Sequence, residues 1–192
     1  ARAAALTHGH PLGYIPAAVL AHIVNVGVYG GCQRGDTLRD AVEDAMETAQ
    51  KLFGGVPLLE SLIGRAVSLA ENGRPDQENI RELGEGWTGE EALAIAVYAS
   101  LRYSEDFSEG IIAAVNHSGD SDSTGAVTGN ILGAWLGCDA IEEKWKKNLE
   151  LKNIILELAD DLCRGCVITD EGSCEDPAWE SKYIRCRKPG AV

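Results

Sequence analysis

The sequence of 192 residues predicts an all-α fold, and three observations lead to that prediction. Apolar residues recur at helical spacing in segment after segment, and Gly or Pro ends several of these segments. No segment alternates apolar and polar residues for long enough to indicate a strand. The length suits one domain with a sizeable core. We therefore expect a single domain over residues 1–192, with a polar tail over residues 165–192.

The first part of the chain predicts three helices. Leu12–Gly27 is apolar on nearly all sides, which is typical of a buried helix. Thr37–Phe53 carries apolar residues at the i, i+3, i+4 spacing of an amphipathic helix. Val56–Asn72 continues as another helix until Gly73 and Pro75 end it. One buried helix and two further helices are thus expected in this part.

The second part predicts further helices around a central one. Thr88 and Glu91 have the spacing of a capping box, in which the Glu91 carboxylate accepts the N–H of Thr88. They open the long apolar run EEALAIAVYASLRY, which favours a central helix. A shorter helix is expected at Asp106–Val115 and another at Leu149–Leu162. The polar tail is expected to be a loop with a short helix.

The charge balance excludes one class of partner. The chain has 17 Lys and Arg against 30 Asp and Glu, a formal net charge of −13. Such a surface repels phosphate backbones, so general nucleic-acid binding is not expected. No apolar run is judged to approach the length of a membrane span, so no membrane association is expected either. We expect a cytoplasmic protein.

The six cysteines do not form the pattern of a disulfide-rich scaffold. Cys32 and Cys138 stand alone in apolar surroundings and are expected to be buried thiols. The other four cysteines come late in the chain, at Cys163, Cys166, Cys174 and Cys186. Their spacing does not match common zinc fingers. We favour reduced thiols without metal, and a zinc site is the alternative.

Two aspartates and a serine lie directly before and within the start of another helical segment. Asp120 and Asp122 are followed by Ser123. Carboxylates and hydroxyls are hard oxygen ligands, which suit Mg²⁺, Ca²⁺ or Mn²⁺. Two converging carboxylates repel each other unless a cation lies between them. The plainer interpretation is a helix N-cap with solvated neighbours. The Asp-x-Asp spacing leaves both interpretations open.

The same segment carries a glycine at every fourth position. These residues are Gly125, Gly129, Gly133 and Gly137, and this spacing places them on one helix face. Each glycine in a helix interior costs about 1 kcal/mol relative to alanine. We therefore expect this face to lie in the interior, where another backbone packs very close to it.

The whole phrase GDSDSTGAVTGNILGAWLG, Gly119–Gly137, resembles the C-terminal metal motif of the ADP-ribosylglycohydrolase family. Two further phrases agree with it in the right order. LTHGHPLGYIPAAVLAHIV, Leu6–Val24, is similar to the Thr-His segment with which the family helps to hold ADP-ribose. GEGWTGEEALAIAVYASLRY, Gly84–Tyr103, is similar to the loop and helix that line the same pocket. The resemblance implies a compact orthogonal multi-helix domain.

The resemblance also implies an activity and a metal site. The activity is hydrolysis of the glycosidic bond of ADP-ribosyl adducts, with two Mg²⁺ or Mn²⁺ ions as cofactors. Asp120 and Asp122 would ligate the metals through their carboxylates, and Ser123 would add its hydroxyl. The partners would be ADP-ribose or an ADP-ribosylated protein or small molecule.

The resemblance assigns substrate contacts to three more residues. His8 would lie against the phosphates or the ribose of ADP-ribose. Gly86 and Trp87 would lie near the sugar or the adenine. By residue type, His8 can equally be a histidine that only packs or caps, and Trp87 is more often a core residue.

One departure from the family limits what this chain is expected to do. Relatives carry an N-terminal Thr-Asp-Asp motif with further metal ligands and a nearby catalytic glutamate, and this sequence has neither. We therefore expect the chain to be the C-terminal part of such an enzyme, inactive by itself, with the catalytic residue in a missing N-terminal part. One alternative is a non-catalytic ADP-ribose-binding, metal-binding or structural member of the same fold. Another is a zinc-stabilised helical module built on the late cysteines.

Overall fold

The computed structural model describes residues 1–32, 34–167, 169–171 and 174–185. It divides into two compact units, Ala1–Glu143 and Lys144–Val192. No β-strand occurs in these described ranges, and the all-α prediction is confirmed. The single domain expected over residues 1–192 stays a prediction.

The first unit is a packed group of α-helices. They are α1 (Arg2–Ala5), α2 (Pro11–Tyr29), α3 (Leu38–Phe53), α4 (Pro57–Ala70), α5 (Asp76–Leu83), α6 (Gly89–Arg102), α7 (Phe107–Val115) and α8 (Ser121–Leu136). A short 3₁₀-helix, η1 (Cys138–Ala140), follows. Five of the predicted helices of this unit are found within a few residues of their expected ends.

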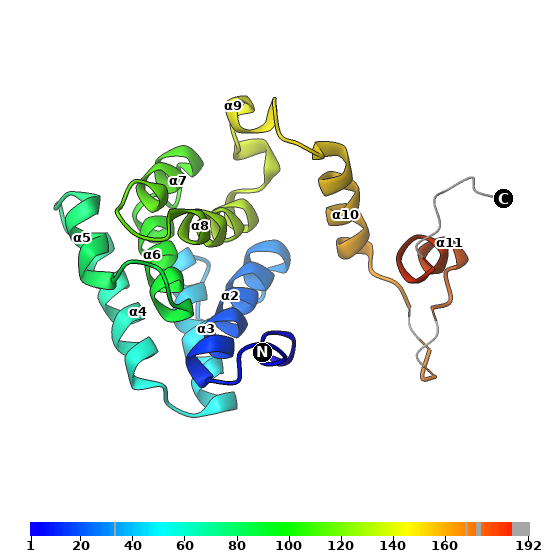
Figure 1. Cartoon of the computed structure of the whole chain (residues 1–192), viewed down its shortest axis with the longest axis horizontal. Helices are drawn as coiled ribbons and strands as arrows, with labels where there is room; N and C mark the ends of the chain where they lie inside the picture. Colours follow the sequence, from blue (N-terminus) through cyan, green and yellow to red (C-terminus); the bar gives the residue numbers. More distant parts are fainter. Residues whose placement is uncertain (33, 168, 172–173, 186–192) are drawn as a thin grey trace. The chain divides into compact units, whose positions relative to one another are not determined.

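Helix α6 is the centre of this unit, as predicted. Every residue from Ala92 to Ser100 is buried. The helix contacts α2, α4, α7 and α8, which surround it in Figure 1. Its many alanines allow these neighbours to approach closely, because an interior is packed to the density of an organic crystal. The continuous apolar run in the sequence therefore reflects burial on all sides.

Helix α2 differs from its prediction in two ways. It buries one face, with Ile15, Val19 and Ile23 in the core, while Val28 is 47% exposed. It is also long and apolar enough to cross a membrane by length and composition, so the expectation that no apolar run has that length is wrong. Its contacts with α3, α6 and α8 are those of a core helix in a globular unit.

A capping box forms at one helix start where none was predicted, and it is absent at the start where it was predicted. A complete capping box forms at α3, where Thr37 and Asp40 bond each other's backbone N–H groups. The capping box predicted at Thr88 does not form, because its side chain makes no cap hydrogen bond. The carboxylate of Glu91 instead accepts hydrogen bonds from the two N–H groups of residues 85–86.

The sequence reading missed helix α5. Its start has recognisable signals, namely Pro75 at the N-cap position and acidic residues in the first turn. The carboxylate of Asp76 accepts hydrogen bonds from the hydroxyl groups of Tyr98, at 2.5 Å, and of Tyr103, at 2.8 Å. Burial, together with this hydrogen bond, raises the pKa of Tyr98. These bonds tie the start of α5 to the central helix.

The remaining elements are α9 (Glu143–Lys146), α10 (Lys152–Arg164), α11 (Pro177–Trp179) and the π-helix η2 (Glu180–Ile184). Helix α10 begins later than predicted, because Leu151 adopts a left-handed conformation with φ of 57°. The Asp161 carboxylate pairs with Lys182 at 2.6 Å and accepts the Tyr183 hydroxyl at 2.5 Å. The expected short helix of the tail is confirmed.

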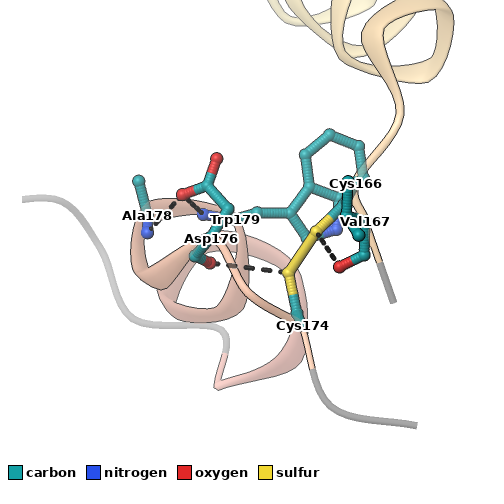
Figure 2. The surroundings of a disulfide bond; sticks show 6 residues. All are labelled: Cys166, Val167, Cys174, Asp176, Ala178 and Trp179. Carbon is teal, nitrogen blue, oxygen red and sulfur yellow. Dashed lines mark hydrogen bonds between the residues drawn. A yellow bond between two sulfur atoms is a disulfide. The ribbon is translucent and has the colours of Figure 1, made fainter. Parts of the chain in front are cut away.

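The cysteines depart from the sequence-based expectation. Cys166 and Cys174 form a disulfide, shown in Figure 2, so the favoured state of reduced thiols is wrong for this pair. Two sulfur atoms bonded to each other do not serve as thiolate ligands, which argues against the zinc alternative; Cys186 lies outside the described residues. Cys32 is half-buried and Cys138 is exposed, so neither is the buried thiol expected.

Candidate functional site

The predicted metal-binding residues lie together at the start of α8. Asp120 occupies the N-cap position, but its side chain makes no cap hydrogen bond of good geometry. Hydrogen bonding with the carboxyl group of Asp122 holds the pKa of Asp120 below its usual value, and the Ser123 hydroxyl adds to this effect. The Ser123 N–H contributes less. The carboxyl group of Asp120 therefore lies within hydrogen-bonding reach of Asp122 and Ser123, although the Asp122 side chain is exposed.

The donor set fits a hard divalent cation in part. Two carboxylates and a hydroxyl are suitable ligands for Mg²⁺ or Mn²⁺. Among the described residues there is no group of three or more His, Cys, Asp or Glu side chains that could hold a metal ion. Mg²⁺ takes about six oxygen ligands, so Asp120, Asp122 and Ser123 can supply only part of a two-ion site. Their role as ligands stays a prediction.

The loop before α6 lies directly against the segment that leads into α8. The N–H of Asp120 donates to the carbonyl oxygen of Glu85 at 2.7 Å. A Cβ atom on Gly119 would lie 1.8 Å from that same oxygen, so no other residue fits there. Gly86 has φ of +81°, and a Cβ there would lie 2.8 Å from Cγ2 of Thr124. The close backbone approach that was expected along the regularly spaced glycines of α8 is found here instead.

Two residues that the sequence analysis did not single out, Thr124 and His117, anchor this segment. The hydroxyl of the buried Thr124 donates to the carbonyl oxygen of Ala114 at 2.7 Å and lies 3.0 Å from Nε2 of His117. Nδ1 of His117 accepts the N–H of Gly119 at 3.1 Å. The histidine proton therefore belongs on Nε2. The contacts of Thr124 join residues 7 and 10 positions away across the turn between α7 and α8, so helical spacing in the sequence carried no signal for them.

The structure brings the three quoted phrases together. The second phrase meets the third where Gly86 packs on Thr124. It meets the first at Gly89, where a Cβ would lie 3.1 Å from the carbonyl oxygen of Leu12. Helix α2, which carries most of the first phrase, crosses α8 of the third phrase, and Gly27, just after the first phrase, packs against the backbone of Ala134. Segments more than 100 residues apart thus share one region of the unit.

The predicted substrate-binding residues occupy different environments around this region. Gly86 is buried, whereas Trp87 is 68% exposed and donates its indole N–H to the Glu85 carboxylate at 3.2 Å. His8 lies in the exposed turn before α2, where Nδ1 is 2.8 Å from the Thr7 hydroxyl. Within the described part of the chain, no hydrogen bond joins His8 to the start of α8.

The sequence predicted that the glycine face of α8 lies in the interior, and this prediction is wrong. A Cβ on Gly125 would lie 2.6 Å from Val115, but one on Gly129 would make an ordinary contact of 3.6 Å with Ile111. A Cβ on Gly133 would meet nothing within 4 Å. The buried residues of α8 are instead Thr124, Thr128, Ile131 and Leu132. The larger apolar groups on that side gain more from burial than glycine does.

A cavity of about 400 Å³ opens beside the candidate ligands. It lies between α5 and the two loops that lead into α6 and α8. Its lining residues are Gln77, Ile80, Arg81, Gly84, Glu85, His117 and Ser118. This volume is within the range of small-molecule sites. The site region therefore has a hollow as well as a group of converging oxygen ligands.

Comparison with known proteins decides the family. The sequence model of the family described as ADP-ribosylglycohydrolase matches residues 1–171. The chain belongs to the ADP-ribosylglycohydrolase family. Membership indicates a hydrolase fold and substrates that carry ADP-ribose, at the level of the family. No solved structure shows a significant match.

The curated relatives are distant and longer than this chain. Human ADP-ribosylhydrolase ARH3 is 26% identical over 167 residues, which are 77% of this chain and 46% of the relative. The mouse protein of the same name is 26% identical over 167 residues, 77% of this chain and 45% of the relative. An uncharacterized protein of Archaeoglobus fulgidus is 29% identical over 118 residues, 60% of this chain and 38% of the relative. The chain spans less than half the length of these relatives.

Proposed function

We propose that the full-length protein hydrolyses the glycosidic bond at C1 of the distal ribose in an ADP-ribosyl adduct. One observation carries the proposal within this family. The carboxyl groups of Asp120 and Asp122 and the hydroxyl of Ser123 meet at the start of α8, although a single cap residue would satisfy the helix. When both carboxyl groups are ionised they repel each other unless a cation lies between them.

Each predicted residue has a role in this proposal. Asp120, Asp122 and Ser123 would hold part of a site for two Mg²⁺ or Mn²⁺ ions, which when bound orient the ribose hydroxyls and polarise the reacting centre. Gly86 lets the loop backbone approach the sugar, and the exposed indole of Trp87 offers a flat surface for the sugar or adenine. The acid or base that moves the proton is sought outside this chain.

The substrate would extend from the metal ligands at the start of α8 over the neighbouring surfaces. The cavity lined by Arg81 and Glu85 has room for a small group of the adduct. His8 lies in the turn before α2, the helix whose first turn contacts Gly89 at the start of α6. These positions support contacts to ADP-ribose along three segments, in keeping with the substrates of the family.

The test is release of ADP-ribose from a mono-ADP-ribosylated protein. We expect the full-length protein to release it with Mg²⁺ or Mn²⁺ present, and not after chelation. The 192-residue chain by itself should bind metal weakly and turn nothing over, because three ligands from one turn cannot hold two ions. Hydrolysis by this chain at the full-length rate would contradict the division of the site.

A non-catalytic binding protein of the same fold is the second candidate. The incomplete ligand set among the described residues favours it for the chain taken by itself. If the full-length protein binds ADP-ribose but releases none from arginine-linked, serine-linked or small-molecule adducts, the binding function replaces the proposed hydrolase activity.

A further inference from the structure

We propose that Glu91, in the first turn of α6, is a positioning residue for Asp120. The inference rests on the proposed function, because it concerns a residue that we assign as a metal ligand. One carboxylate oxygen of Glu91, Oε2, accepts the N–H of Glu85 at 3.1 Å and the N–H of Gly86 at 3.1 Å. Both donors belong to the loop that touches the start of α8.

The loop passes this constraint on to the ligand through its backbone. The carbonyl oxygen of Glu85, the residue whose N–H Glu91 holds, accepts the N–H of Asp120 at 2.7 Å. Gly119 packs on the same carbonyl oxygen so tightly that a Cβ has no room. A shift of the loop would therefore move the backbone from which the Asp120 carboxylate projects.

The surroundings of Glu91 suit this task better than capping. Glu91 does not bond the N-cap residue Thr88, although the sequence spacing allows it. Gly84 adopts φ of +122°, and a Cβ there would lie 2.4 Å from Cδ of Glu91. Because Gly84 has no side chain, the loop backbone can pass close to the Glu91 carboxylate. Hydrogen bonds from N–H groups to a carboxylate are about twice as strong as those between neutral groups.

The expected consequence is the one known for groups that orient metal ligands. Such groups do not touch the metal, yet their loss costs about 10–100-fold in metal affinity or activity. Replacing Glu91 by Ala leaves two loop N–H groups without their acceptor and frees the loop. Replacing it by Gln keeps an oxygen atom that can accept both N–H groups, so most of the effect should be restored.

The experiment compares Glu91→Ala, Glu91→Gln and a matched control in the full-length protein. The control is Glu60→Ala, since Glu60 makes an equivalent contact at the start of α4, accepting the N–H of Val56 at 3.1 Å. Two quantities are measured: hydrogen exchange of the Asp120 amide without metal, and Mn²⁺ affinity by calorimetry. Glu91→Ala should speed the exchange and weaken Mn²⁺ binding by about 10–100-fold. Glu91→Gln and Glu60→Ala should change both far less.

The outcomes separate this inference from the proposed function. Unchanged Asp120 exchange in Glu91→Ala would overturn the inference, and so would Mn²⁺ affinity equal to that of Glu60→Ala. If the wild-type protein takes up no Mn²⁺, the proposed function fails, while the exchange measurement still decides whether Glu91 positions Asp120. Loss of Mn²⁺ binding in Asp120→Asn, with normal binding in Glu91→Ala, would keep the function and reject the inference.

Discussion

Helices α3 and α8 both begin with an aspartate and a hydroxyl residue, but the two starts use these groups differently. At α3, the Asp40 carboxylate is bound within its own turn by the N–H and hydroxyl groups of Thr37. At α8, Asp120 lies at the N-cap position without a well-formed cap bond, and its carboxyl group interacts with the carboxyl group of Asp122 and the hydroxyl of Ser123. The first arrangement completes a helix end, and the second leaves oxygen atoms available to a ligand.

The difference shows that residue types at a helix start do not by themselves indicate function. A capping box satisfies two N–H groups and stabilises the helix locally. The start of α8 is held by other means, through the Glu85 carbonyl oxygen and the buried hydroxyl of Thr124. Because the backbone is anchored by partners from elsewhere, the Asp120 side chain is not needed as a cap.

The largest expected effect is on metal binding at the α8 start. Asp120→Asn or Asp122→Asn should weaken Mn²⁺ binding to the full-length protein by about 100-fold or more, since each removes a charged ligand. The effect should exceed that of removing a group that only supports a ligand. Helix content by circular dichroism should stay unchanged. Asp40→Asn is the matched control and should leave Mn²⁺ affinity as it is. Undiminished calorimetric affinity in both α8 variants would reject the metal site.

The next effect contrasts the glycines before the two helices. Gly119→Ala places a Cβ against the Glu85 carbonyl oxygen and should lower the free energy of unfolding by about 3 kcal/mol. Gly35→Ala would place its Cβ 2.5 Å from the Asp40 carboxylate, which can rotate away, so about 1 kcal/mol is expected. Denaturant unfolding measures both. Equal costs would mean that the two loops near Gly119 are not in backbone contact.

A smaller effect separates the capping role of Thr37 from the metal-binding role of Ser123. Thr37→Ala should cost about 1 kcal/mol, or about 2–4 °C in melting temperature, because it removes the cap of α3. Ser123→Ala should change stability by less than about 0.5 kcal/mol while weakening Mn²⁺ binding. A thermal scan and a metal titration of each variant are sufficient. The comparison breaks down if Ser123→Ala proves the more destabilising of the two.

The smallest effect is a pH dependence at the α3 start. Hydrogen bonds from the Thr37 hydroxyl and then its N–H hold the pKa of Asp40 below its usual value. This bonding therefore contributes stability above about pH 4, the pKa of Asp in an unfolded chain, and loses it as the pH falls toward the depressed folded pKa. Melting temperatures between pH 2 and pH 6 should fall less steeply in Thr37→Ala. Parallel curves would show that the Thr37 bonds do not lower this pKa.

The sequence by itself determined most of the helices of the first unit and the candidate ligands. Periodic apolar residues predicted α2, α3, α4, α6 and α7 within a few residues of their ends, because helix formation and capping depend on neighbours within one or two turns. The same local information placed Asp120, Asp122 and Ser123 at a helix start. Resemblance in three phrases predicted the family, which the comparison confirmed.

Only the tertiary structure decided which groups meet across the fold. The buried side of α8 is set by the apolar residues that gain most from contact with α2, α6 and α7, so the glycine spacing misled. The partner of Glu91 changed from Thr88 to the loop at residues 85–86, which is itself bonded to the α8 start through the Glu85 carbonyl oxygen. The bond from Asp120 to Glu85 joins residues far apart in the chain. The energies of such contacts depend on packing and burial, which no short stretch of sequence contains.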